Sequence, residues 1–202
     1  MYFLANLDKN INRMEWNTLK STGVVRRIDD LGRVVIPKEI RKTLRIKEGE
    51  PLEIFTDREG QVILKKYSPI GELSEFATGY AETLSKTTGH IACITDKDTV
   101  IAISGGPKKE FLEQNVSDEL EQLMEDKEVY TSKENSDVAV PITKNDNNER
   151  KYNSQVVYPI ISNGDTIGTV ILLSKESNTK MNEVEKKVAQ SAASFLGSQM
   201  EI

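Results

Sequence analysis

Two short apolar runs in the first third of the chain place the strongest constraint on its fold. "RVVI" at 33–36 and "QVIL" at 61–64 are near-continuous apolar runs, as in strands that are covered on both faces. The segment that holds them has room for only one short helix, and a unit of roughly 50 residues buries too little surface to be comfortably stable alone. A second copy of the chain must therefore supply the missing cover. The pattern predicts an obligate homodimer in which short strands of two chains interleave.

The other signals in this segment are also those of short strands and turns. "GVVRRI" is rich in β-branched residues, and "DDLG" is a turn signal in which Gly32 can take a positive φ. After the strand at 33–36, Pro37 suits the first turn of a short helix, where its missing N–H is not needed. "PLEIFT", "DREG" and "QVILKK" then predict a hairpin with Gly60 in its turn.

Charge is distributed unevenly along the sequence and divides it into two modules. Residues 20–68 carry 12 basic and 8 acidic side chains, whereas the chain as a whole has a net charge of -5. A basic module followed by an acidic one suggests that only the first meets a polyanion. Ser68, Pro69 and Gly71 in "KKYSPIGE" suit a connection between domains. The expected layout is an N-terminal extension, a basic domain, a linker and a second domain, at 1–19, 20–68, 69–72 and 73–202.

The short helix after Pro37 separates an apolar face from a basic one. At about 100° per residue, Ile40 and Leu44 lie close together, and Arg41, Lys42 and Arg45 fall on other sides. A two-fold dimer would present such basic faces in pairs, which suits a two-stranded, repeating anion. The alternative is an ordinary solvated basic face, which charge alone does not exclude.

The stretch "STGVVRRIDDLGRVVIPKEIRKTLRIKEGEPLEIFTDREGQVILKKY" resembles the swapped-hairpin DNA-binding domain of the AbrB transition-state regulators. Its most specific element is "D-x-L-G-R-V-V-I-P" followed by a basic short helix. The resemblance implies an intertwined dimeric β-barrel that presses basic side chains against double-stranded DNA. At Lys42 family members often have arginine, and a lysine there keeps a phosphate contact. The implied DNA-binding residues, with the adjacent Arg27 included, are Arg26, Arg27, Arg33, Arg41 and Lys42.

The second module follows the pattern of an alternating α/β unit. Its first helix, in "GELSEFATGYAETLSK", carries a wide apolar stripe. Hairpins are predicted at "HIACIT-DKD-TVIAIS" and "QVVYPIIS-NGD-TIGTVILLS", where Asn163 and Gly164 suit a tight primed turn. Short helices beginning at Pro107 and Ser117 and the polar stretch "TKNDNNERKYN" lie between the hairpins. The stripe expected on the final helix consists of Val184, Val188, Ala192, Phe195 and Gln199. The first and last helices are expected to pack together on one side of the sheet, or to bundle with another subunit.

This order of elements resembles a GAF domain, which implies a sensory module that can enclose a small ligand and that commonly dimerises. No residue cluster identifies a ligand, so no cofactor is predicted. Whether the second module binds an unidentified small molecule stays open. Two dimerising modules in one chain predict a homotetramer. From residue 20 to 202 the chain resembles sporulation regulators with a regulatory second half. The expected protein is an α+β, sequence-specific DNA-binding regulator, activator or repressor, of sporulation genes.

Two other classes of protein share features with this sequence. Cys93 and His90, the only cysteine and the only histidine, are three residues apart and offer a thiolate pair to an enzyme, but a strand start and a small buried thiol fit better. One cysteine and one histidine also exclude an internal disulfide and a structural zinc site. The AbrB-type barrel occurs in antitoxins as well, usually followed by a disordered acidic tail, whereas this acidic half has regular apolar periodicity. "MYFLANLDKN" lacks a basic leader and a long apolar core, so a cytoplasmic protein without a membrane segment is expected.

Overall fold

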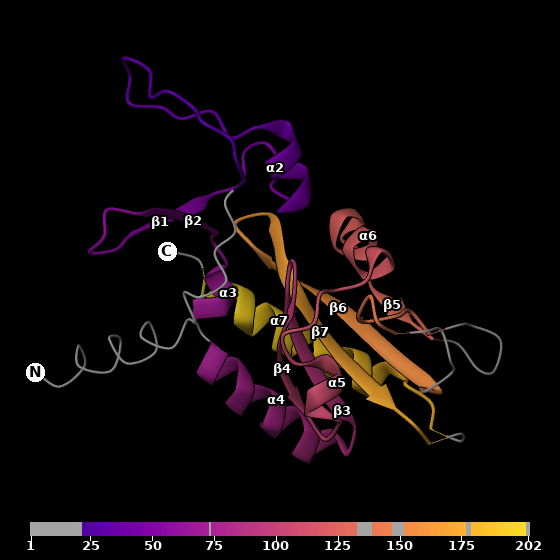
Figure 1. Cartoon of the computed structure of the whole chain (residues 1–202). Helices are drawn as coiled ribbons and strands as arrows, with labels where there is room; N and C mark the ends of the chain where they lie inside the picture. Colours follow the sequence, from indigo (N-terminus) through magenta and orange to yellow (C-terminus); the bar gives the residue numbers. More distant parts are fainter. Residues whose placement is uncertain (1–21, 73, 133–138, 147–151, 177–178, 201–202) are drawn as a thin grey trace, which may run out of the picture. The chain divides into compact units, whose positions relative to one another are not determined.

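A computed structural model of the chain describes residues 22–72, 74–132, 139–146, 152–176 and 179–200 (Figure 1). The chain forms two compact units that meet in sequence at Pro51 and Leu52. The extension predicted at 1–19 lies outside the described residues. None of the helices in the described ranges is long and apolar enough to cross a membrane.

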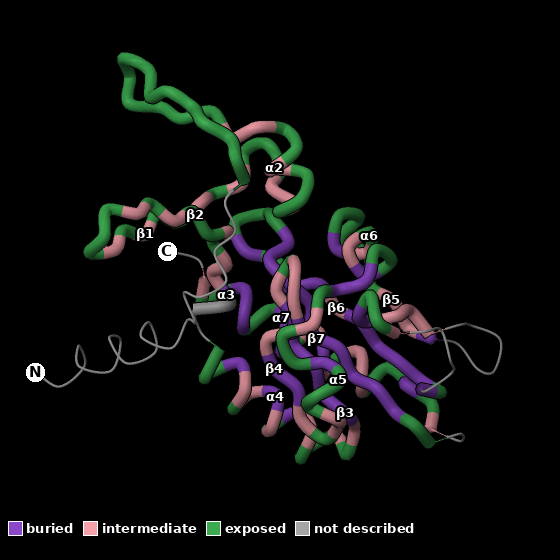
Figure 2. The backbone as a smooth tube through the Cα atoms, viewed as in Figure 1, coloured by how far each residue is buried: buried purple, intermediate pink, exposed green. Residues whose placement is uncertain are grey.

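The first unit contains a tight turn between two extended segments. The turn forms as predicted: Gly32 N donates to Asp29 O at 3.0 Å, Asp29 N donates to Arg33 O at 3.1 Å, and Gly32 has a φ of 75°. Strands were expected on either side of this turn, but the described residues 22–36 contain no strand. Residues 22–35 are exposed along their whole length (Figure 2). The apolar run at 33–36 was predicted to be covered on both faces, and one copy of the chain does not provide that cover.

Helix α2, Lys38–Thr43, follows this loop and is short. Pro37 is its N-cap, one residue earlier than the predicted position in the first turn, and the Pro37 carbonyl accepts the first helical bond from Arg41 N at 2.9 Å. The helix ends at Leu44, and Arg45 takes a left-handed φ of 52°. No residue of α2 is buried, so its apolar face is still available for packing.

The second unit begins with the predicted hairpin of β1, Leu52–Thr56, and β2, Val62–Lys66. Gly60 closes its turn with a φ of 83°. Ile54 pairs with Leu64 in the antiparallel register, and both side chains are exposed. The hairpin therefore has the right register and an apolar face that lacks cover.

A five-stranded antiparallel sheet forms the centre of the second unit, in the order β4-β3-β7-β6-β5. Both predicted hairpins are confirmed. Asn163 and Gly164 have φ values of 49° and 85°, the two positive angles that a type I′ turn requires. The two-residue strand β5 was not predicted, since two residues carry no periodic pattern. The strands are β3 Ile91–Asp96, β4 Val100–Ser104, β5 Tyr130–Thr131, β6 Ser154–Ser162 and β7 Asp165–Ser174.

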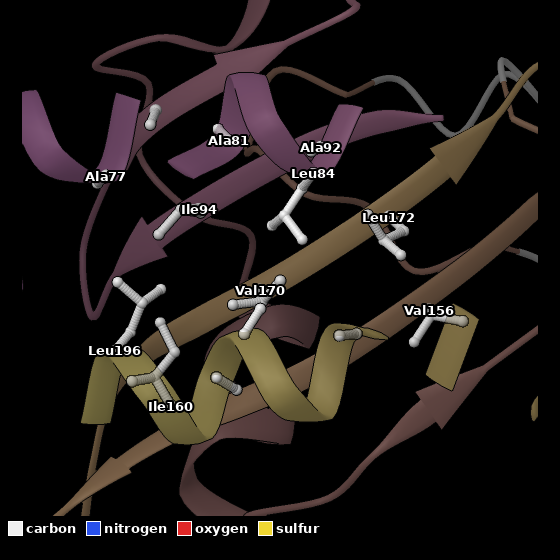
Figure 3. Close-up of a cluster of buried hydrophobic side chains, with 14 of the residues drawn as sticks. Ala77, Ala81, Leu84, Ala92, Ile94, Val156, Ile160, Val170, Leu172 and Leu196 are labelled. Carbon is white, nitrogen blue, oxygen red and sulfur yellow. The ribbon is translucent and has the colours of Figure 1, made fainter. Parts of the chain in front are cut away.

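Helices cover both faces of this sheet. Helix α4, Ser74–Thr88, and helix α7, Glu183–Ser198, pack on one face, as expected, against a core that includes Ile94, Val170 and Leu172 (Figure 3). The short helix α3, Pro69–Glu72, precedes α4. The opposite face is covered by α5, Lys108–Phe111, and α6, Asp118–Asp126, where Ser117 is the predicted N-cap and accepts from Leu120 N at 3.0 Å.

The stripe predicted on the last helix is partly wrong. Val184 and Phe195 are 64% and 41% exposed, and the buried face of α7 consists of small residues and one leucine instead. Small side chains bring the helix close to the sheet, and a Cβ at Gly197 would clash with the Ile161 backbone oxygen. The buried residues of α7 are Ala189, Ala192, Ala193, Leu196 and Gly197.

Candidate nucleic-acid interface

Four of the five residues predicted to bind DNA have exposed side chains in the first unit. Arg26 and Arg27 precede the turn, Arg33 follows it, and Lys42 lies in the last turn of α2. Arg41, also on α2, is only half-exposed. Cations at this end of a helix interact favourably with its dipole, although six residues make that dipole small.

The structure arranges these residues along a segment and does not gather them into one patch. Residues 22–36 form a hairpin-shaped loop that extends away from α2 (Figure 1). Arg26, Arg27 and Arg33 belong to this loop, and Arg41 and Lys42 belong to the helix at its base. In one copy of the chain the five side chains are therefore two groups, one on the loop and one on α2.

Arg33 is held in place by two hydrogen bonds to Asp29. Its Nε donates to Asp29 Oδ2 at 2.8 Å, and its backbone N donates to Asp29 Oδ1 at 2.7 Å. The Arg33 side chain still has 69% of its surface exposed. The turn thus holds a guanidinium group in place while most of it faces solvent.

Asp29 was predicted as a turn residue, but the sequence-based prediction gave it no role beside these basic groups. The hydrogen bond from the Arg33 backbone, and then the bond from the Arg33 side chain, lower the pKa of its carboxyl below the ordinary 3.8. Asp29 is therefore ionised at neutral pH. The signal that could have found it is the spacing itself, an aspartate four residues before an arginine with a glycine between them.

Arg41 has a different environment from the others. Its Nε is buried and, among the described residues, has no hydrogen-bond partner. Leaving a buried N–H group without an acceptor costs free energy. Arg41 is thus the predicted site residue whose surroundings in one copy of the chain are least complete.

Cys93, the residue considered as a catalytic nucleophile, is buried and protonated. Cys93 is fully buried in β3, and its burial raises the pKa of the thiol to about 12. The thiol is therefore protonated at neutral pH, whereas a nucleophile needs the thiolate. His90 Nε2 lies 3.8 Å from Glu185 Oε1. The described residues contain no group of three or more His, Cys, Asp or Glu side chains that could hold a metal ion.

Two protein families match the chain. The model described as "Stage V sporulation protein T C-terminal, transcription factor" matches residues 72–201. The model "Antidote-toxin recognition MazE, bacterial antitoxin" matches residues 25–72. The two matches meet at residue 72.

The proteins that are similar to the chain include two curated relatives and one solved structure. Stage V sporulation protein T of Bacillus subtilis is 50% identical over 183 residues, covering 91% of this chain and 99% of the relative. The transition state regulatory protein AbrB of the same organism is 61% identical over 51 residues, which is 25% of this chain and 52% of AbrB. The GAF domain of Acinetobacter phosphoenolpyruvate-protein phosphotransferase has a TM-score of 0.53 at 11% identity, covering 63% of this chain and 81% of that domain.

These similarities confirm the expected fold class. The α+β chain joins an AbrB-like segment to a GAF-like domain, and the structural likeness of the second domain concerns its fold alone. A family model matches well over half of the chain, and a relative of nearly the same length is half identical. The chain therefore belongs to the stage V sporulation protein T family of transcription factors.

Proposed function

We propose that this chain is a sequence-specific DNA-binding regulator, activator or repressor, of sporulation genes. It contacts DNA through Arg26, Arg27, Arg33, Arg41 and Lys42. The observation that carries the proposal is the exposed, ordered guanidinium of Arg33 on a turn within a net positive segment. The 61% identity to AbrB over 51 residues supports the same role for this segment. The proposal places the protein in the cytoplasm, where it meets the chromosome.

The basic side chains divide by what each can contribute to binding. Lysine and arginine that neutralise phosphates release counterions and give affinity without choosing a sequence. A guanidinium held in a fixed orientation can bond two acceptors on a guanine edge, which does choose a sequence. Exposed Lys42 suits the first role and Arg33 suits the second. The α2 helix is too short to read many bases, so DNA shape also contributes to site choice.

DNA binding requires a homodimer in this proposal. Val25, Ile28 and Val35 are 86%, 69% and 72% exposed in one copy of the chain. Burying such side chains releases about 1.5–3 kcal/mol each relative to leaving them in water. A second copy that pairs with residues 22–36 would complete the predicted strands and cover these side chains. The dimer then presents two copies of the basic segment to the two strands of DNA.

The GAF-like domain joins two such dimers into a tetramer. Phe76 and Tyr80 of α4 and Phe195 of α7 form a cluster, with ring centroids 5.6–6.0 Å apart. Phe76 and Phe195 are each 41% exposed. An exposed aromatic cluster on a helix pair suits packing against the same cluster of another copy, so that the helices of both form a bundle.

The proposed domain layout is 20–68 for the DNA-binding domain, 69–72 for the linker and 73–202 for the second domain. The family matches at 25–72 and 72–201 support it. The division of one chain at Pro51 differs from this layout, because it leaves the hairpin of β1 and β2 in the second unit, where Lys66 Nζ lies 2.8 Å from Asp98 Oδ1.

An antitoxin is the second candidate, favoured by the match of the antitoxin family model to residues 25–72. Its weakness is the folded domain that follows, because a regular five-stranded sheet takes the place of a disordered toxin-binding tail. Copurification of a stoichiometric toxin from the native host would favour it. An enzyme that uses Cys93 is disfavoured by the protonated, buried thiol.

Removing single basic groups tests the proposed DNA surface. Lys42→Ala and Arg41→Ala should each weaken binding to DNA, and each should flatten the plot of log affinity against log salt by about 0.9 for every phosphate that the variant no longer neutralises. Fluorescence anisotropy over a salt series measures both effects. Lys187→Ala, which removes an exposed cation from α7, is the matched control and should leave the slope unchanged. Unchanged slopes in both the Lys42 and the Arg41 variant would contradict the assigned surface.

A further inference from the structure

Two turns of this chain are built in the same way, 28 residues apart in sequence. In the first, Asp29 Oδ1 accepts from Leu31 N at 3.0 Å and from Arg33 N at 2.7 Å. In the second, Asp57 Oδ1 accepts from Glu59 N at 2.9 Å and from Gln61 N at 2.8 Å. Each turn has a glycine of positive φ before its last residue, Gly32 in one and Gly60 in the other.

The turns differ in what the second carboxylate oxygen does. Asp29 Oδ2 accepts from Arg33 Nε at 2.8 Å, whereas the corresponding residue of the other turn is Gln61, whose amide donates to Glu59 at 3.2 Å. The second turn forms without an aspartate-arginine pair. The ion pair of the first turn is therefore not needed to make the turn, and its effect falls on Arg33 itself.

Binding Nε fixes how Arg33 can approach a ligand. A guanidinium has five N–H donors, and the pair with Asp29 occupies the one on Nε. The four donors on the two terminal nitrogens project beyond it, which suits an end-on bidentate contact with two acceptors. A freely rotating arginine would reach the nearest phosphate instead, because phosphates carry the strongest negative charge on DNA.

We infer that Asp29 is a positioning residue, which holds the Arg33 guanidinium for end-on recognition of a base edge and withholds it from phosphate. This inference rests on the proposed DNA-binding function. The carboxylate also repels the DNA backbone, so it lowers affinity for every sequence and raises discrimination between sequences. Its lowered pKa keeps that charge in place at neutral pH.

Asp29→Asn separates the ion pair from the turn. The asparagine Oδ1 can still accept the two backbone N–H groups, but the side chain loses its charge and the acceptor for Arg33 Nε. Asp57→Asn removes the same charge from the matching turn, where Gln61 takes the position that Arg33 has in the first turn. The probes are a duplex enriched by the unmodified full-length protein from a random-sequence pool and a shuffled duplex of the same base composition.

Asp29→Asn should bind the shuffled duplex more tightly and lower the ratio of enriched to shuffled affinity by roughly 5- to 100-fold, as expected when one good bidentate bond to a base is removed. Its salt dependence should steepen by about 0.9 for each Arg33 that moves to a phosphate. Asp57→Asn should leave the ratio unchanged. In an Arg33→Ala background, Asp29→Asn should have no further effect on the ratio, since the aspartate acts through the arginine.

Three outcomes would overturn the inference: equal ratios for Asp29→Asn and Asp57→Asn, an undiminished effect of Asp29→Asn in the Arg33→Ala background, or a parallel loss of affinity for both duplexes, which a damaged turn would cause. Failure of the proposed function looks different, because the unmodified protein would then not enrich or discriminate any duplex.

Discussion

Individual residues of this protein have environments that the sequence indicates only in part. The turn aspartate and glycine at 29 and 32 were predicted from their types, but the ion pair from Asp29 to Arg33 depends on a side-chain orientation that the four-residue spacing permits and does not fix. Cys93 was expected to be a small buried thiol, and its complete burial agrees with that interpretation. Residue type thus predicted the turn and the buried thiol, and geometry added what each side chain contacts.

The buried thiol predicts a loss of stability at alkaline pH. Because burial raises the pKa of Cys93 from 9.0 to about 12, the unfolded chain releases this proton at a lower pH than the folded one. The stabilising contribution is complete below about pH 9 and is lost as the pH rises toward 12, at about 1.4 kcal/mol per pH unit. Urea denaturation at pH 8.5 and at pH 10 measures the difference in the free energy of unfolding between the two pH values. Cys93→Ala should show a smaller loss over this interval, and an equal loss in both proteins would contradict the assignment.

At the scale of elements, local signals predicted hairpins well and packing faces less well. Both hairpins of the GAF-like sheet were predicted because their turns carry residues for positive φ, such as Asn163 and Gly164. The face of α7 was misjudged because Val184 and Phe195 are more hydrophobic than the alanines that it buries. The strands expected around 24–36 are absent from one copy of the chain, and the predicted homodimer assigns their completion to a second copy.

The hairpin of β1 and β2 is joined to the GAF-like domain by an ion pair that should stabilise the chain. Lys66 Nζ lies 2.8 Å from Asp98 Oδ1, and the two side chains are 24% and 31% exposed. Lys66→Met keeps the apolar stem and should lower the free energy of unfolding by about 1 kcal/mol. The control is Lys86→Met, since Lys86 is 79% exposed and 3.8 Å from Glu82, and its loss should change little. Chemical denaturation compares the two, and equal effects would contradict a stabilising joint.

At the scale of the whole molecule, the chain combines a segment that is incomplete alone with a domain that has its own core. The GAF-like sheet is buried on both faces by helices, whereas residues 22–35 are exposed. This contrast explains why the fold class of the second domain is predictable from one chain, whereas the apolar runs of the first domain make sense only when a second copy covers them. It also implies that assembly decides whether the basic segment takes its DNA-binding form.

The proposed tetramer is tested at the aromatic cluster of α4 and α7. A two-fold contact through Phe76 and Phe195 would bury four phenylalanines, so replacing both by serine removes apolar burial twice over. Phe76→Ser/Phe195→Ser should weaken association of dimers roughly 100-fold or more and leave dimers in sedimentation velocity at concentrations where the unmodified protein is tetrameric. Val129→Ser, which removes an apolar side chain of similar exposure, 46%, from outside the cluster, should stay tetrameric.

A tetramer that persists in the double variant would place the contact elsewhere, and an unmodified protein that never exceeds a dimer would end the proposal. Because the N-terminal dimer depends on residues 22–36 and not on this cluster, the double variant should keep DNA binding by each dimer while losing any gain from two linked dimers.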